Sequence, residues 1–231
     1  QTGTKNLTGG SLIYPIYINT AGLITSITNN FIGGTNDSGS GVWTIQSTGA
    51  TRFCGIYINS VKSGASIGSF NGNRISGIDL TSYSAGNGTD GVVAGIILKA
   101  GNVVNSAETS PNEVSNITLR FGTTMSGSNG LCGYTYFYGA GACNLGYIKV
   151  NNLTAIPVGA NAGIISGKVV GIYTGNAYGT SCKAAEVHDL VCGTTGSQGA
   201  HQVYGIYSYS GSNRPNTIER NFVYNLNAVS T

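Results

Sequence analysis

One group of residues in the chain has side chains that could carry out acid–base chemistry. Glu186, His188 and Asp189 lie within a few residues of one another, and Lys183 precedes them. Carboxylates beside an imidazole can transfer protons or bind a metal ion. This group is the candidate catalytic site of the sequence.

The surrounding pattern gives the same residues a structural interpretation. The segment from Val187 to Leu190 is one copy of a motif in which two apolar residues flank two small, amide or polar residues. Five further copies span Ile24–Ile27, Ile75–Ile78, Val114–Ile117, Val150–Leu153 and Val223–Leu226. Asp commonly replaces Asn at a bend of the chain. The repeat therefore favours a structural role for Glu186, His188 and Asp189 over catalysis.

The rest of the chain supplies no second catalytic candidate. It has eight acidic residues, and none of them forms an Asp-Asp or Asp-x-Asp pair. His201 has no acidic neighbour in the sequence and is expected to lie in a loop. No nucleophile elbow, phosphate loop or zinc-ligand spacing occurs. The sequence thus indicates no metal and no cofactor.

A second motif supplies aromatic residues at a regular interval. Gly55-Ile56-Tyr57-Ile58 recurs with variations about every 38 residues. A strand places the isoleucines on one face and the tyrosine on the other. Aligned copies put Tyr17, Tyr57, Tyr173 and Tyr207 in one outward position, shared with Ile97 and with Thr135 or, after a shift of one residue, Tyr136. Such a stripe could bind sugar rings or another chain, or could be a ladder that stabilises the wall.

The strict alternation of the two motifs predicts the fold. A fixed period of this length is typical of solenoids and related arrays. Only 8% of residues are charged, and 37 are glycine, which favours an all-β chain with many turns. We expect one domain over residues 1–231, a right-handed parallel β-helix of about six repeats. Each repeat would form one wide coil, although two short coils remain an alternative.

Asparagines occupy positions where such a helix must bend. Asn and Gly tolerate the left-handed backbone conformation of a bend. Asn73, Asn112 and Asn221 also precede the bend motif by two positions. Stacked asparagine side chains can hydrogen-bond to one another from coil to coil.

The five cysteines leave the redox environment open. Cys132 with Cys143, and Cys182 with Cys192, are close enough in sequence to form loop disulfides, which would imply an oxidising compartment. The alternative, stronger for Cys54 and Cys132, is that they fill core positions beside the repeat glycine.

The net charge of +3 includes no basic stripe, which argues against nucleic acid as a partner. No apolar run approaches the ~18 residues of a membrane span.

Three segments carry a resemblance to a known group of proteins. Asn29-Asn30-Phe31-Ile32-Gly33-Gly34-Thr35, Gly55-Ile56-Tyr57-Ile58 and Asn71-Gly72-Asn73-Arg74-Ile75-Ser76-Gly77-Ile78 resemble repeats of very large secreted proteins of Bacteroidota. The resemblance implies a right-handed β-helix, an extracellular or cell-surface location, type IX secretion and an adhesive role. It also implies that the chain is a segment of a longer protein.

Two functions follow as hypotheses. The first is a non-catalytic structural or adhesive segment of a bacterial surface or filament protein. Its partners would be other copies or neighbouring repeats, joined through the coil ends, with cell-surface glycans as candidate ligands. The alternative is a carbohydrate-active β-helix enzyme, either a polysaccharide lyase or a depolymerase. An enzyme requires acidic side chains that converge in one groove, whereas a structural wall requires only scattered acids.

Overall fold

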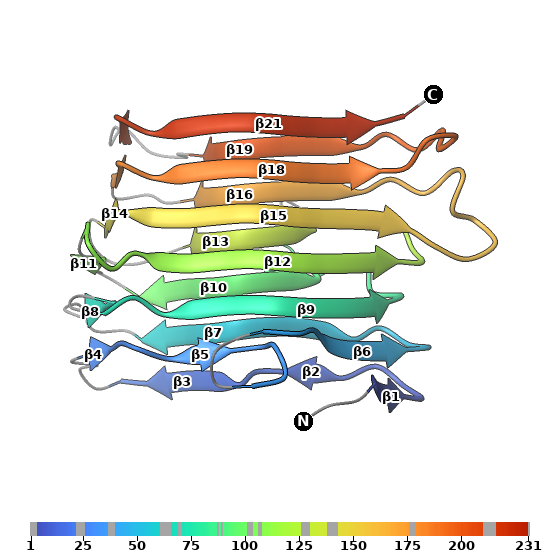
Figure 1. The fold of residues 1–231 in the computed structure, drawn as a ribbon, viewed down its shortest axis with the longest axis horizontal. Helices are drawn as coiled ribbons and strands as arrows, with labels where there is room; N and C mark the ends of the chain where they lie inside the picture. The colour runs from blue at the N-terminus through green and yellow to red at the C-terminus, as the bar shows by residue number, and fades with distance from the viewer. Residues whose placement is uncertain are drawn as a thin grey trace.

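The strands stack into a parallel β-solenoid of about five turns, which confirms the expected fold class (Figure 1). A computed structural model describes residues 4–21, 26–36, 40–60, 66–68, 71–86, 88, 90–100, 104–105, 108–125, 130–137, 143–175, 179–209 and 216–230. The N-terminal and C-terminal coils lie at opposite ends of the stack. Within the described residues no helix is long and apolar enough to cross a membrane.

Three parallel sheets, named A, B and C here, form the wall of the solenoid. Sheet A contains β1 (Thr4–Leu7), β5 (Phe31–Ile32), β6 (Trp43–Ser47), β9 (Arg74–Ser82), β12 (Asn112–Phe121), β15 (Ile148–Pro157), β18 (Glu186–Gly193) and β21 (Phe222–Val229). Sheet B contains β2 (Leu12–Ile13), β3 (Ile16–Thr20), β7 (Arg52–Ser60), β10 (Val93–Ala100), β13 (Leu131–Phe137), β16 (Lys168–Gly175) and β19 (Gln202–Tyr209). Sheet C contains β4 (Ser26–Ile27), β8 (Ser66–Ile67), β11 (Val104–Asn105), β14 (Cys143–Gly146), β17 (Thr180–Lys183) and β20 (Thr217–Glu219).

Each sequence period forms one wide coil, which excludes two short ones. The chain passes once through sheet B, then sheet C, then sheet A, as in β10, β11 and β12. In Figure 1 the long strands of sheet A lie in front of those of sheet B, and the short strands of sheet C close one side. The repeating glycine motif lies in sheet B, and five of the six bend motifs lie in sheet A.

One continuous core fills the space between the sheets. Ile96 pairs in register with Ile56 on one side and with Tyr134 on the other. Tyr134 pairs with Ile172, which pairs with Ile206. All five side chains pack in the same hydrophobic cluster. The repeated motif therefore forms a single column along one tube.

Close packing across the tube explains why the two motifs alternate. A Cβ atom at Gly95 of sheet B would lie 2.5 Å from a methyl group of Val114 in sheet A. The same contact would measure 2.4 Å between Gly133 and Val150. Only glycine allows the two walls to approach this closely. The glycine of one motif thus makes room for the first apolar residue of the other.

The bend motif kinks each strand of sheet A at a left-handed residue. The backbone φ angles are 53° at both Asn116 and Asn152, 54° at Asp189, 51° at Asn225 and 69° at Gly77. Each strand continues through its kink, as β12 does at Asn116. Five of the six expected bends therefore adopt the left-handed conformation. The first copy differs, because Ser26 lies in β4 of sheet C without a positive φ, and Ile24 and Thr25 lie outside the described residues.

Buried asparagines form the expected ladder between coils. Asn73 donates from its side-chain amide to the Oδ1 atom of Asn112 at 2.9 Å, and its backbone N–H reaches the same oxygen at 2.8 Å. Asn30 bonds to Asn73 in the same way, at 2.8 Å and 3.2 Å. In the next coil Ile148 occupies the position of Asn112, so the ladder is interrupted there. It resumes at Asn221, which accepts a hydrogen bond from the backbone N–H of Ala185 at 2.8 Å.

Candidate functional site

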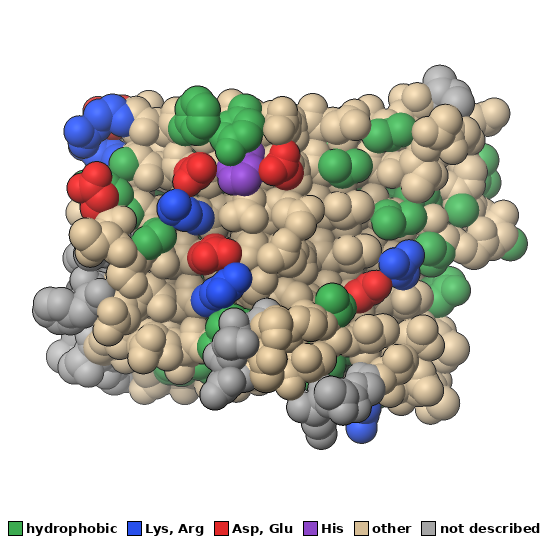
Figure 2. Space-filling view, in the orientation of Figure 1, with side chains coloured by type: hydrophobic (Ala, Val, Ile, Leu, Met, Phe, Trp, Pro, Cys, Tyr) green, Lys and Arg blue, Asp and Glu red, His purple; other side chains and the backbone are tan. Residues whose placement is uncertain are grey.

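The outer face of sheet A carries charged side chains of alternating sign. Arg74, Glu113, Lys149 and Glu186 occupy one column in successive coils. Arg74 lies 3.6 Å from Glu113, and Lys149 lies 3.1 Å from Glu186. Figure 2 shows acidic and basic side chains side by side on this face. Because the pairs join neighbouring coils, they act first as cross-strand contacts.

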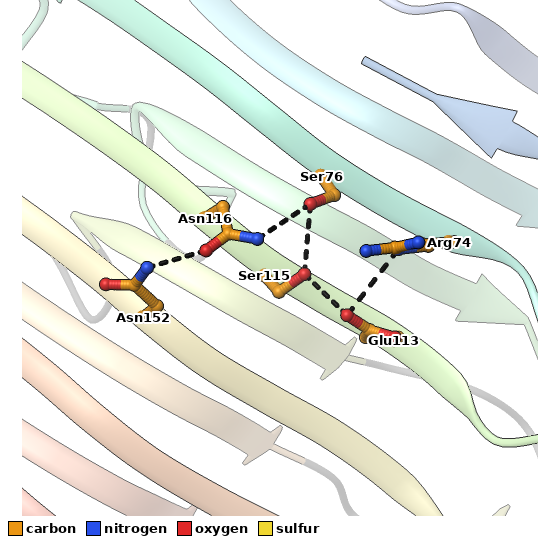
Figure 3. Close-up of polar contacts among 6 residues, drawn as sticks. All are labelled: Arg74, Ser76, Glu113, Ser115, Asn116 and Asn152. Atoms are coloured by element: carbon orange, nitrogen blue, oxygen red, sulfur yellow. Dashed lines mark hydrogen bonds and ion pairs between the residues drawn. The ribbon is translucent and has the colours of Figure 1, made fainter. Parts of the chain in front are cut away.

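Hydroxyl and amide groups extend these contacts across the same face (Figure 3). Ser115 donates to Glu113 at 2.7 Å, and its Oγ atom lies 3.0 Å from that of Ser76. The side-chain amide of Asn152 donates to Asn116 at 2.6 Å, and that of Asn116 donates to Ser76 at 3.2 Å. The network spans three coils, because a polar group on one strand faces a partner on the next.

The structure brings Glu186, His188 and Asp189 together near the C-terminal end of sheet A. The Nδ1 atom of His188 lies 2.7 Å from Asp189, and Nε2 lies 3.7 Å from Glu186. The imidazole stacks on Tyr224 of the next coil, with ring centres 4.5 Å apart and planes at 6°. The Lys183 amine instead lies 2.6 Å from Glu219.

The surroundings of this cluster oppose a role in general acid catalysis. A hydrogen bond from Asn225, and a second one with His188, hold the pKa of Asp189 below its usual value. Asp189 therefore remains ionised near neutral pH. Glu186 faces Lys149, and both ring nitrogens of His188 face carboxylates. The cluster links three successive coils.

A hollow of about 260 Å³ lies beside the cluster. It is lined by Glu108, Pro111, Tyr147, Lys149, Ala184 and Glu186. Two carboxylates in one hollow are the feature that a carbohydrate-active enzyme requires. Among the described residues, no group of three or more His, Cys, Asp or Glu side chains could hold a metal ion.

The tyrosine column lies on the outer face of sheet B. Tyr17 pairs with Tyr57, and Tyr173 pairs with Tyr207. Each pair stacks, with ring centres 5.3 Å and 5.4 Å apart and planes at 22°. The register places Thr135 in the column between them and excludes Tyr136, which packs in the core.

The column is nevertheless not one continuous exposed stripe. Tyr17 is 52% exposed, whereas Tyr173 is only 2% exposed because it packs with Cys132 and Val170 on the outer face of sheet B. Ile97 and Thr135, which are buried, separate the two tyrosine pairs. A long aromatic platform for sugar rings is therefore absent from this column.

All five cysteines are buried and none forms a disulfide, so the structure contains neither of the two candidate disulfides. Cys132 lies in the cluster outside sheet B, whereas Cys143 lies in the main core. The sheet wall thus separates the members of the first pair. Cys182 and Cys192 both reach the main core, from sheet C and sheet A respectively. Burial raises the pKa of the Cys132, Cys182 and Cys192 thiols to about 12.

His201 makes contacts that the sequence did not reveal. Its Nδ1 atom accepts a hydrogen bond from the backbone N–H of Gly167 at 3.1 Å. Its Nε2 atom lies 2.7 Å from the Ser197 hydroxyl. In the neutral ring Nδ1 is the acceptor, so Nε2 carries the proton and donates to Ser197. Because Nε2 has no free lone pair, His201 does not activate Ser197 as a nucleophile.

A second missed contact lies on the outer face of sheet B. The Lys99 amine lies 2.7 Å from Asp90 and 5.5 Å from the centre of the Tyr57 ring. Asp90 belongs to a segment without a strand period, so no sequence signal placed it beside Lys99.

Comparisons with known protein families, curated proteins and solved structures found no match to this chain.

Proposed function

We propose that this chain is a non-catalytic, extracellular structural or adhesive segment of a bacterial surface protein. The proposal takes its cellular setting from the resemblance to secreted repeat proteins of Bacteroidota and to type IX secretion. Cell-surface glycans are the candidate ligands of its outer faces. A stiff stack of coils with polar outer walls suits such a role.

The pairing of acidic side chains supports this proposal most strongly. Asp79, Asp90, Glu113, Glu186 and Glu219 each contact a basic side chain. A carboxylate that is held by a cation is poorly placed to accept or donate a proton during hydrolysis. The acids thus stabilise the wall between coils.

A carbohydrate-active enzyme is the second candidate, and the hollow that Glu108 and Glu186 share favours it. In that case Glu108 and Glu186 would act on a glycosidic bond as acid and base. The two proposals differ in whether a polysaccharide is shortened or only bound.

The test compares turnover with binding on a panel of acidic and neutral polysaccharides. The wild-type chain, Glu186→Gln and Glu108→Gln are assayed for new reducing ends and for retention on polysaccharide-coated beads. We expect no turnover by any of the three proteins, and bead retention that both variants keep. Turnover that disappears in Glu186→Gln would establish the enzyme instead.

A further inference from the structure

An open hollow of about 400 Å³ lies at the corner of the solenoid where the chain passes from sheet A to sheet B. This corner is on the right of Figure 1. The corner hollow is lined in part by Gly10, Ser11, Ala50, Arg52, Ser84 and Gly86. These residues come from three successive coils, so the hollow opens sideways from the wall and not along the axis of the stack. Its volume lies within the range of small-ligand sites, roughly 300–1,000 Å³.

Arg52 gives the corner hollow a positive charge. It precedes Phe53 in β7, and because the Phe53 side chain packs in the core, that of Arg52 lies on the outer face of sheet B. In the described part of the chain no carboxylate pairs with Arg52, whereas five other basic side chains each lie 3.6 Å or less from one. The described lining residues include no acid, and Asp90, in the loop that follows β9, is held by Lys99 at 2.7 Å. The hollow therefore favours an anionic ligand.

The loop of residues 83–92 forms one rim of the corner hollow, and both of its ends are fixed to the preceding coil. Its first residue, Tyr83, donates its backbone N–H to the carbonyl of Gly49 at 3.1 Å. Its last residue, Val92, accepts at its carbonyl from the backbone N–H of Phe53 at 3.0 Å. Because these bonds hold the rim in place, the hollow is formed before any ligand binds.

Ser84 brings an unused hydrogen-bond donor to the same rim. Its side chain is only 6% exposed, and its Oγ atom accepts from the backbone N–H of Gly86 at 3.1 Å. Among the described residues none accepts a hydrogen bond from the Ser84 hydroxyl. Because buried polar groups are normally paired, this donor indicates a partner from outside the chain. Ser11 supplies a second hydroxyl to the hollow.

We propose that the corner hollow binds the carboxylate of an acidic sugar in a cell-surface glycan. This inference rests on the proposed adhesive role and names the class of ligand. The guanidinium of Arg52 presents its N–H donors in a planar fork that matches the two oxygens of a carboxylate. The hydroxyls of Ser11 and Ser84 can bond to the neutral hydroxyls of the same sugar. A neutral sugar would leave the charge of Arg52 without a partner.

The test is a titration of the full chain with methyl glucuronide, followed in the amide NMR spectrum of the protein. We expect saturable shifts of the Gly10, Ser11 and Gly86 signals, and none with methyl glucoside at the same concentration. Arg52→Gln removes both the charge and the fork, and is expected to weaken binding of the glucuronide about tenfold or more. Arg52→Lys keeps the charge without the fork, and is expected to weaken binding severalfold.

Arg74→Gln is the matched control, because it removes the same charge from the outer face of sheet A, outside the corner hollow. It is expected to bind the glucuronide as wild type does. Glucose 6-sulfate separates a carboxylate site from a general anion site, and is expected to bind more weakly than the glucuronide. The dispersion of each amide spectrum establishes that the variant is folded, and two substitutions of Arg52 are used so that misfolding of one does not decide the result.

Other results would overturn the proposal. A glucuronide that causes no saturable shift, or a glucoside that causes the same shifts, would show that the hollow does not select acidic sugars. Equal binding of glucose 6-sulfate would indicate a general anion site, and an equal loss in Arg74→Gln would indicate an effect of net charge alone. Bead retention that accompanies any of these results leaves the adhesive role intact, whereas absent retention with an intact glucuronide site opposes the adhesive role alone.

Discussion

At the scale of single residues, asparagine has two separate structural roles in this solenoid. Asn116, Asn152 and Asn225 adopt the left-handed conformation at the bends of sheet A. Asn73 and Asn112 are fully buried and satisfy backbone groups of neighbouring coils. The first role depends on how well the residue tolerates the left-handed backbone conformation, and the second depends on its side-chain hydrogen bonds. Mutation at the two kinds of position should therefore affect stability differently.

Replacement of Asn112 by alanine is expected to lower the free energy of unfolding by roughly 2–5 kcal/mol. The change leaves the amide groups of Asn73 and the carbonyl of Ile67 without their partner in a buried site. Guanidinium unfolding measures the loss. Asn144→Ala, at an exposed position on β14, is the control and should change stability little. Equal effects of the two substitutions would contradict a structural ladder.

His201 is expected to make the fold sensitive to mild acid. Burial lowers its pKa, so the unfolded chain binds a proton at a higher pH than the folded chain does. Stability is therefore complete above the unfolded pKa of about 6.5 and falls as the pH drops from there through the folded pKa. The groups that face the ring, the Ser197 hydroxyl and the Cys192 thiol, carry no compensating charge.

The denaturation midpoint measured from about pH 8 to pH 5 tests this dependence. We expect wild type to lose stability below about pH 6.5 and His201→Gln to show a flatter profile. Asn144→Ala, which removes no titratable group from an exposed position, is the control and should keep the wild-type slope in this range. A wild-type slope that persists in His201→Gln would assign the acid sensitivity to another group.

At the scale of elements, the distance between sheets A and B decides which residues the repeat can use. The glycines of sheet B face the first apolar residue of the bend motif in sheet A, and the gap accommodates no extra carbon. The packing between sheets A and B therefore leaves no room for a side chain at the repeat glycines.

Gly95→Ala is expected to lower the free energy of unfolding by about 1–3 kcal/mol through overpacking. The new methyl group would meet Val114 at 2.5 Å and the carbonyl of Gly133 at 2.6 Å. Gly163→Ala is the control, because nothing lies within 4 Å of its Cβ position. Thermal unfolding of both variants measures the difference. An unchanged free energy of unfolding in Gly95→Ala would show that sheets A and B can move apart without loss of stability.

The long strands could be predicted from the sequence because their residues repeat in a fixed order. The isoleucine column and the bends at Asn116 and Asn152 follow directly from that order. The residues of the short strands that form sheet C could not be located from the sequence, because strands of two to four residues such as β8 carry no usable period.

The candidate site was predictable to a lesser degree. The repeat alignment put Glu186 and His188 at positions that point to solvent or to the bend, and both lie on β18 of sheet A. It did not reveal that Tyr173 is buried, because that depends on packing with Cys132 and Val170 outside the sheet. The contact of His201 with Ser197 arises within a single loop, so no comparison of coils could indicate it.

At the scale of the whole molecule, three cysteines lie in the core of the tube, and Cys54 and Cys132 lie in clusters on the outer face of sheet B. All five cysteines are buried, and burial raises the pKa of four of the thiols, Cys54, Cys132, Cys182 and Cys192. A protonated and inaccessible thiol reacts slowly with disulfide reagents. The cysteines thus behave as small apolar residues of the wall and core.

A thiol titration is expected to count no reactive cysteine in the native chain near pH 8 and all five in denaturant. Ellman's reagent measures both values. A count of three in denaturant without reductant would indicate that one disulfide had formed, and a count of one would indicate two. Rapid reaction of the native chain would show that the coils open readily.

The hydrogen bonds between coils run along the line that joins the two ends of the chain (Figure 1). A mechanical load applied between the termini therefore pulls these bonds lengthwise, one layer at a time. Each coil contacts only its neighbours. The outermost coil should therefore detach first, and its residues should extend before the next coil unfolds. The molecule would then behave as an extensible tether that lengthens in steps of one coil and shields whatever it holds from sudden force.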